Sequence, residues 1–434
     1  MAGQGARILT IGMAIAFSLE IRAAEPETWF DEHVPGLVAL YKDLHRNPEL
    51  SFQEVETSRR LAAELRKAGA EVTEGVGKFG VVGLIRNGKG PTVLVRSDMD
   101  ALPVTEETPL EYASKARAVD REGKSVGVMH ACGHDVHMAC LVGTARWLSE
   151  HKDRWSGTVV LIGQPAEEAI GGAKAMLADG LYTRFPKPDY ALALHVTNDQ
   201  PAGKLAYTSG PALAGSTSVN LTFKGRGGHG AAPHLTIDPI VLAALAIVDF
   251  QSIVAREIDP LTPSVLTVGS IHGGTKHNII PDDVKLQLTL RAYGDDVRDR
   301  LIRGIRRRLK GLSEAHGAPE ASFEIAETTP PTINTPKLVE RIIPVFRKEF
   351  GESQVAAVPP VMGAEDFGLY GRDGVPTFMF RLGSINPEQH ARAVQERKPL
   401  PSLHSATYYP DAPASIRMGV RAMSCAVVEL LPPA

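Results

Sequence analysis

Residues 128–137 form the segment Val-Met-His-Ala-Cys-Gly-His-Asp-Val-His, which places four potential metal ligands within eight positions: His130, Cys132, His134 and His137. Positions two apart do not share a face of a helix, so the Cys-x-His spacing predicts an irregular loop. Gly133 permits unusual backbone angles there, and an apolar helical pattern follows at once, with Asp135 as its expected cap. A capped loop with solvated histidines is the alternative, but four ligands together favour a metal site.

The composition is that of an ordinary globular protein. The chain has 434 residues, of which 43% are hydrophobic and 22% charged, so more than one domain with a large core is expected. The net charge of −3 gives no reason to expect nucleic acid or an anionic membrane as a partner. Three cysteines do not make a disulfide framework, and the apolar patterns around Cys140 and Cys425 favour buried free thiols.

Residues 1–24 resemble a secretory signal peptide. Arg7 precedes an apolar run over residues 8–19, and Ala23-Ala24 offers small residues for cleavage, although Glu20 and Arg22 are unusual just before such a site. The run is too short to span a bilayer, and we expect no other stretch of the chain to do so. The sequence therefore predicts a periplasmic or secreted protein.

Strands and helices alternate through the first half of the chain. Helical patterns cover residues 29–44 and 54–68, and apolar runs predict strands at 81–85, 92–95, 158–162 and 190–194. Polar residues follow three of these strands: Asp98 and Asp100, then Glu167 and Glu168, then His195. Ligands collect at the carboxyl ends of strands in open α/β sheets, so we expect these side chains to converge with the metal loop.

Residues 216–329 have the element order of a ferredoxin-like fold. Strands and helices are expected at 219–223, 239–256, 265–271, 284–292, 297–315 and 322–325, in the order β-α-β-β-α-β. We therefore predict an α/β catalytic domain with a mostly parallel sheet, formed by residues 25–215 and 330–434. Into it is inserted a ferredoxin-like α+β domain over 216–329, which would act as a lid or dimerisation domain.

The adjacent carboxylates Glu167 and Glu168 suggest a division of roles. If one binds a metal ion, its neighbour can take a proton from water at that ion, which is the general-base arrangement of metal hydrolases. A solvated acidic turn is the alternative. Either Asp98 or Asp100 could be a ligand or orient a ligand histidine, and His195 is a ligand candidate.

The other candidates are weaker by themselves. The glycine-rich segment 225–234 carries His229 and lacks the lysine and spacing of a phosphate loop. Asn278 and Arg291 could together hold a substrate carboxylate, and a hairpin with a surface arginine is an equally good reading. His404 lies in a loop rich in proline and serine.

These motifs together resemble the amidohydrolase branch of the aminoacylase and glutamate-carboxypeptidase metallopeptidases, which includes hippurate hydrolases and indole-acetyl-amino-acid hydrolases. The matching segments follow the family's order through nearly the whole chain: 43–51, 97–103, 130–137, 164–168, 194–195, 227–234, 278–282, 362–367 and 403–404.

The resemblance implies two divalent metal ions per subunit, with the ligands Cys132, His134, Glu168, His195 and His404. Glu167 would be the general base, and three residues would support the ligands: Asp98, His130 and His137. Thiolate and imidazole ligands favour zinc, whereas carboxylates also suit manganese or cobalt.

The resemblance also implies roles for the inserted domain. His229 would polarise the scissile carbonyl in the partner subunit's site of a homodimer, and Asn278 and Arg291 would take the substrate carboxylate. Three departures from the family leave substrate size and shape open: His277, Leu288 and the long charged loop Asn386–Ser402.

We therefore expect a metal-dependent amidohydrolase acting on small-molecule N-acyl amino acids, such as hippurate or N-acetyl amino acids, to give a carboxylic acid and an amino acid. A dipeptidase or carboxypeptidase on the same scaffold is one alternative. A non-catalytic periplasmic binding protein is another, but it would have no need of a free base such as Glu167 beside a ligand.

Overall fold

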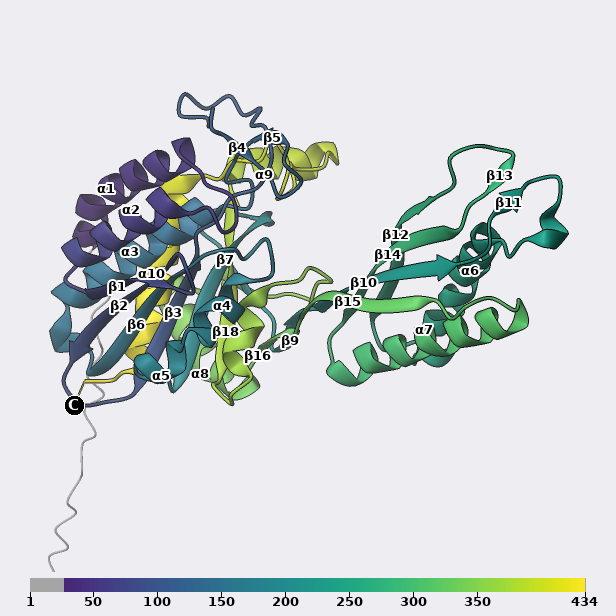
Figure 1. Ribbon diagram of the computed structural model, residues 1–434. Coiled ribbons are helices and arrows are strands. Elements are labelled where there is room, and N and C mark those ends of the chain that lie inside the picture. The colour runs from purple at the N-terminus through teal and green to yellow at the C-terminus, as the bar shows by residue number, and fades with distance from the viewer. Residues whose placement is uncertain (1–26, 434) are drawn as a thin grey trace, which may run out of the picture.

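The structure, a computed structural model, describes residues 27–433 and contains two structural units (Figure 1). The predicted signal segment, residues 1–24, lies outside the described residues. The larger unit is built on an eight-stranded sheet with the order β1 (Glu71–Val76), β2 (Gly80–Asn87), β6 (Gly157–Gln164), β3 (Thr92–Asp98), β7 (Tyr190–Pro201), β18 (Thr377–Ile385), β8 (Leu205–Tyr207) and β17 (Val355–Ala357). The four central strands, β6, β3, β7 and β18, run parallel.

Helices cover both faces of this sheet, which confirms the predicted α/β class. One face shares a core with α1 (Glu27–Arg46), α2 (Val55–Lys67), α3 (His134–Glu150), α8 (Pro336–Phe350) and α10 (Ala412–Leu430). The opposite face packs against α4 (Gly172–Ala178), α5 (Leu181–Arg184) and the short 3-10 helix η4 (Asp366–Gly371). Because both faces are buried, the central strands are apolar on both sides until they reach their carboxyl ends.

The second unit stands beside the strand ends and has its own hydrophobic core (Figure 1). Its elements are β10 (Gly215–Lys224), α6 (Pro239–Glu257), β12 (Ser264–Gly273), β14 (Asp283–Ala292), α7 (Asp295–Ala315) and β15 (Ser322–Thr329). The antiparallel sheet has the order β12-β14-β10-β15, and both helices pack against it. This arrangement is the ferredoxin-like one that the sequence predicted.

Two short strands connect the units. β9 (Gly210–Leu213) and β16 (Thr332–Asn334) pair antiparallel where the chain leaves the larger unit and returns to it. An ion pair spans the same junction. Asp295, at the start of α7, accepts from Arg372 of the larger unit at 2.7 Å. Two further small hairpins are formed by β4 (Arg117–Val119) with β5 (Ser125–Gly127) and by β11 (Gly228–His229) with β13 (Ile279–Ile280).

The segment Asn386–Ser402 is not the continuous loop that we expected. Residues Pro387–Glu396 form helix α9, and the Asn386 side chain caps it by accepting from the backbone N–H groups of Glu388 and Gln389. Asparagine at the cap and proline at the first helical position are standard helix-start signals. They were overlooked because no residue of α9 is buried, so the segment lacks a periodic apolar pattern.

Helix α6 corrects a second expectation. By length and composition alone it could cross a membrane, although we expected no stretch of the chain to qualify. One side of α6 packs into the core of the second unit, through residues such as Leu242 and Phe250. The other side exposes Val241, Leu245 and Val248.

Candidate metal centre

The predicted metal loop runs directly into α3, which begins at His134. Gly133 has a φ of 79°, in the left-handed region, and a Cβ there would lie 2.6 Å from Val196, so this position needs glycine for two reasons. The prediction that the Asp135 side chain caps this helix is wrong. Instead its Oδ2 pairs with His45 at 2.7 Å, which draws the carboxylate into the protein interior.

The five predicted ligands converge on the sulfur of Cys132. Its Sγ lies 3.6 Å from His195 Nε2 and 3.2 Å from His404 Nε2. His404 Nε2 is also 3.4 Å from Glu168 Oε1. Cys132, His134 and Glu168 each offer one atom within 4.8 Å of the others, so strand ends, the metal loop and residue 404 meet in one place.

Two of the ligand histidines are held in the tautomer that metal binding needs. His134 Nδ1 faces the Asp100 carbonyl at 2.8 Å, and His195 Nδ1 faces the Val196 carbonyl at 2.7 Å. A carbonyl only accepts, so each Nδ1 carries the hydrogen and each Nε2 is free for an ion. Burial lowers the pKa of His195 to about 4, which keeps that ring neutral.

The charge around His134 shows that this place attracts a cation. Burial acts to lower the pKa of His134, but Asp98 and Asp100 outweigh it and raise the pKa to about 10. Nε2 of His134 and Oε1 of Glu168 are buried with no hydrogen-bond partner in the described part of the chain. A metal ion would satisfy both atoms.

Asp100 positions the adjacent glutamates and is not a free ligand. Its carboxylate accepts from the backbone N–H groups of Glu167 and Glu168, both at 3.1 Å, and from the Ser51 hydroxyl at 2.6 Å. Burial raises the pKa of the Glu167 carboxyl well above its usual range, and Glu365 and Glu168 raise it further. A carboxyl group with so high a proton affinity suits proton transfer, and a nearby cation would restore its ionised form.

The three residues predicted to support the ligands, Asp98, His130 and His137, differ in their hydrogen bonds. His137 donates from Nδ1 to Asp98 at 2.6 Å and accepts from the Val196 N–H at Nε2, so neither nitrogen is free for an ion. Asp98 also lies 3.6 Å from His134 Nε2 and thus links His137 to a ligand. Within residues 27–433 the buried ring of His130 has no hydrogen-bond partner, so it supports no ligand through a direct bond.

The sequence analysis missed a buried charge cluster behind Glu167. The guanidinium of Arg96 bonds to Asp98 at 2.6 Å, to Glu365 at 2.7 Å and to Asp366 at 3.1 Å. Atoms of Glu167, Glu365 and Asp366 lie within 4.8 Å of one another. A signal was available, because an arginine inside a strand covered on both faces must find buried partners.

A second missed cluster lies under the metal loop. His45 bonds to Asp135 through Nδ1 at 2.7 Å and to Glu106 through Nε2 at 3.0 Å, and all three side chains are almost completely buried. Burial acts to lower the pKa of His45, but the two carboxylates raise it to about 9. The protonated ring therefore ties the first turn of α3 to α1.

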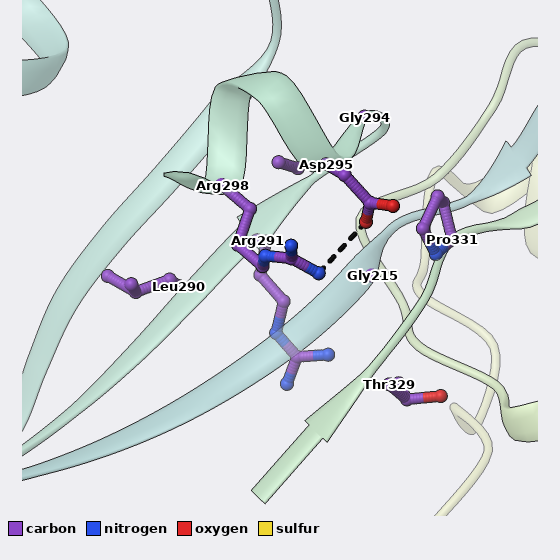
Figure 2. Close-up of a pocket in the computed structure, with 9 residues that line it drawn as sticks. Gly215, Leu290, Arg291, Gly294, Asp295, Arg298, Thr329 and Pro331 are labelled. Atoms are coloured by element: carbon purple, nitrogen blue, oxygen red, sulfur yellow. Dashed lines mark hydrogen bonds and ion pairs between the residues drawn. The ribbon is translucent and has the colours of Figure 1, made fainter. Parts of the chain in front are cut away.

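A cleft of about 800 Å³ opens over the ligands, and Arg291 lies in its wall. Arg291 makes no hydrogen bond or ion pair within residues 27–433. Figure 2 shows this guanidinium near the junction of the units, while the neighbouring Arg298 is joined to Asp295. The structure thus brings Arg291 to the predicted ligands.

His229 and Asn278 lie elsewhere, at the far tip of the second unit in β11 and beside β13 (Figure 1). Asn278 precedes β14 and Arg291 is near its end, so they are on the order of 25 Å apart at the usual rise per strand residue. Our expectation that they bind one carboxylate together is wrong within a single subunit. His229 Nδ1 accepts from the Ala231 N–H at 3.0 Å, which leaves an exposed Nε2–H free to donate.

The donor set fits divalent cations. Three imidazoles, one carboxylate and one thiol are ligand types that zinc accepts. Burial raises the pKa of the Cys132 thiol well above its usual range, and Glu168 and Glu167 add to the effect. A cation beside the sulfur would favour its thiolate form.

Comparison with known proteins agrees with this geometry. Residues 94–409 match the model of peptidase family M20/M25/M40. The chain belongs to this family. One relative, thermostable carboxypeptidase 1 of Saccharolobus solfataricus, is 40% identical over 81% of this chain and 87% of its own. Hippurate hydrolase of Campylobacter jejuni is 38% identical over 75% and 82%, and IAA-amino acid hydrolase ILR1-like 2 of Arabidopsis thaliana is 36% identical over 80% and 76%.

Solved structures lead to the same family. A putative aminohydrolase from methicillin-resistant Staphylococcus aureus has a TM-score of 0.81 and 30% identity, covering 92% of this chain and 98% of its own. The Bacillus subtilis YXEP protein, described as a dinuclear metal-binding peptidase from the M20 family, has a TM-score of 0.76 and 28% identity, covering 93% and 100%. This M20 protein is thus a metal-dependent amidohydrolase or metallopeptidase, as the resemblance predicted.

Proposed function

We propose that this protein hydrolyses the amide bond of N-acyl amino acids, using two divalent metal ions of which zinc is the favoured kind. The observation that carries the proposal is the free carboxyl of Glu167 beside a cluster of five ligands, at the floor of a cleft that also contains the unpaired Arg291. A binding protein needs no such base. An anionic substrate suits Arg291, because guanidinium groups bind carboxylates with paired hydrogen bonds.

Each residue of the site has a separate role in the proposed hydrolysis. When bound, the ions supply a water of lowered pKa and a Lewis acid for the amide oxygen. Glu167 takes the proton from the attacking water and later delivers it to the leaving amine. Asp100 holds the Glu167 backbone in place, and Arg291 fixes the substrate carboxylate at one end of the cleft.

We further propose that the active form is a homodimer in which His229 and Asn278 act on the partner subunit's site. Both residues lie far from the metal centre of their own chain, while His229 keeps an exposed donor. The exposed apolar side of α6 and the free edge of β12 are adjacent and offer a self-complementary surface.

Subunit exchange tests the dimer proposal. Glu167→Gln and His229→Ala are each expected to be inactive alone. In mixed dimers one site of two combines an intact Glu167 with the partner's intact histidine, so about a quarter of wild-type activity should return after random mixing. Background activity, despite mixed dimers detected by mass spectrometry, would contradict action across subunits. A fully active His229→Ala would remove its catalytic role.

Substrate screening tests the hydrolase proposal. The metal-loaded enzyme should release amino acids from hippurate and N-acetyl amino acids, and a chelator should stop the release. Since a carboxypeptidase is among the relatives, the turnover of dipeptides and N-blocked peptides should be measured beside that of the N-acyl amino acids. Faster turnover of peptides than of every N-acyl amino acid would favour the carboxypeptidase alternative.

We also propose export of the mature chain, on the basis of the signal-like residues 1–24. Fractionation of expressing cells should recover an enzyme that lacks these residues outside the cytoplasm. Recovery of the full-length chain in the cytoplasm would refute the proposed export.

A further inference from the structure

A second unpaired arginine lies in the wall of the catalytic cleft. Arg381, on β18, lines the same cleft as Cys132, His195 and Arg291. Its Nη2 atom is buried without a hydrogen-bond partner, and the side chain forms no ion pair within residues 27–433. The metal centre and Arg291 do not account for this second cation.

The sheet places Arg381 next to the metal centre. β18 and β7 are parallel neighbours, and Arg381 is the register partner of His195. Register partners on adjacent strands lie about 4.8 Å apart and project from the same face of the sheet. Arg381 therefore reaches into the cleft from beside a ligand, whereas Arg291 enters from β14 of the second unit.

The groups around Arg381 do not neutralise it. Asp199 is the carboxylate that acts on it electrostatically, yet it forms no ion pair with it, and Asp199 Oδ1 instead accepts from the Thr197 hydroxyl at 2.6 Å. Tyr293, from the second unit, is the other group that acts on Arg381. The cleft wall also contains the uncharged Asn198 and Ser216 and the carboxylate of Glu327, which forms no ion pair with Arg381 within residues 27–433.

A partly buried guanidinium without a partner is costly, because burial removes its hydration. Elsewhere in the molecule arginines of comparable burial are paired, as Arg308 is with Asp249 at 3.0 Å and with Glu257 at 2.7 Å. Arginine binds carboxylates through two parallel hydrogen bonds, so an anionic ligand would satisfy Arg381 best.

We propose that Arg381 binds a second carboxylate of the substrate, so that the preferred substrates are N-acyl amino acids with two acidic groups. The inference rests on the proposed function and narrows its substrate class. One carboxylate is the α-carboxylate shared by all N-acyl amino acids, which Arg291 takes. The second belongs to the amino-acid side chain, as in N-acyl glutamate, or to a dicarboxylic acyl group, as in N-succinyl amino acids.

Two matched substrate pairs test the proposal and distinguish the sources of the second carboxylate. The first pair is N-acetylglutamate against N-acetylglutamine, and the second is N-succinylglycine against N-butanoylglycine. The metal-loaded wild type should prefer the doubly charged member of one pair by about 10- to 100-fold in kcat/KM, the range expected for a hydrogen-bonded charge pair. The pair that shows the preference identifies the end of the substrate that Arg381 binds.

Arg381→Gln should abolish that preference, because it should raise KM far more for the doubly charged substrates than for the singly charged ones. Arg381→Lys should restore part of it, whereas Arg291→Gln should slow both members of each pair alike. If the wild type hydrolyses singly charged substrates equally well and Arg381→Gln leaves both ratios unchanged, the role of Arg381 is overturned while the proposed function stands.

A binding measurement separates this result from failure of the proposed function. Calorimetry with glutarate and with butyrate compares two acids that differ by one carboxylate. The wild type should bind glutarate at least 10-fold more tightly, and Arg381→Gln should remove the difference. Equal affinities for the two acids would overturn the proposal even if no amide substrate were hydrolysed.

Discussion

His45 should make the stability of this protein depend on pH in a way that a single substitution removes. Its ring lies between Asp135 and Glu106, and all three side chains are shielded from water. Burial acts to lower the pKa of His45, but the two hydrogen-bonded carboxylates raise it to about 9. In the unfolded chain a histidine has its ordinary pKa of about 6.5.

The sign and size of the effect follow from this difference. A histidine with a raised pKa in the folded state contributes its full stabilisation below about pH 6.5 and loses it as the pH rises through about 9. The difference between a folded-state pKa of about 9 and an ordinary pKa of about 6.5 corresponds to roughly 3 kcal/mol in the free energy of unfolding. His45→Gln should therefore be most destabilising near pH 6 and much less so near pH 9.5.

Urea unfolding from pH 6 to 9.5, in the presence of a chelator, measures this dependence without a contribution from metal binding. The control is His151→Gln, because the His151 ring bonds to the Trp147 carbonyl and, within residues 27–433, to no carboxylate. The control should keep the wild-type slope between stability and pH. Parallel curves for wild type and His45→Gln would refute the reasoning, since they would show that His45 does not titrate between its two carboxylates.

Three further predictions concern the metal centre and the charge cluster behind it. Cys132→Ser should lose bound metal and activity together, since a hydroxyl is a far poorer anionic ligand than a thiolate; retention of metal by elemental analysis together with full turnover would make Cys132 structural. Glu167→Gln should keep its metal but lose about 100- to 10,000-fold in kcat, whereas Glu168→Gln should lose metal; the opposite pattern would reverse the two roles. Arg96→Met leaves three buried carboxylates without their cation and should cost about 3–5 kcal/mol, seen as a Tm roughly 5 °C lower. An unchanged Tm would show that the carboxylates are protonated.

Periodic patterns were sufficient for most elements because burial in this fold is periodic. A helix was predicted at residues 54–68, and α2 covers Val55–Lys67, since its apolar residues Leu61, Ala62 and Leu65 face a core. Helix α9 was missed because it buries nothing. The short strands β8 and β17 were also missed, because each is three residues long and too short to show a period.

The chemical types of the site residues were visible in the sequence, but their partners were not. Cys132 and His134 could be singled out because they are close in sequence, whereas His404 was a weak candidate by itself and became an expected ligand only through the family resemblance. The structure adds that His137 has no free nitrogen and that Asp100 is occupied by Glu167 and Glu168. Hydrogen-bond occupancy depends on the position of every neighbour, so sequence spacing does not determine it.

The sequence by itself determined the alternation of elements, the inserted unit and the set of metal-binding side chains, because hydrophobic periodicity and ligand chemistry are properties of short segments. Only the tertiary structure decided which charges meet. Arg96 pairs with Glu365 across 269 positions and His45 with Asp135 across 90, while Asn278 and Arg291, close in sequence, are held apart by the length of β14. Buried charges must be paired, but the choice of partner is made by the sheet and helices that bring distant segments together.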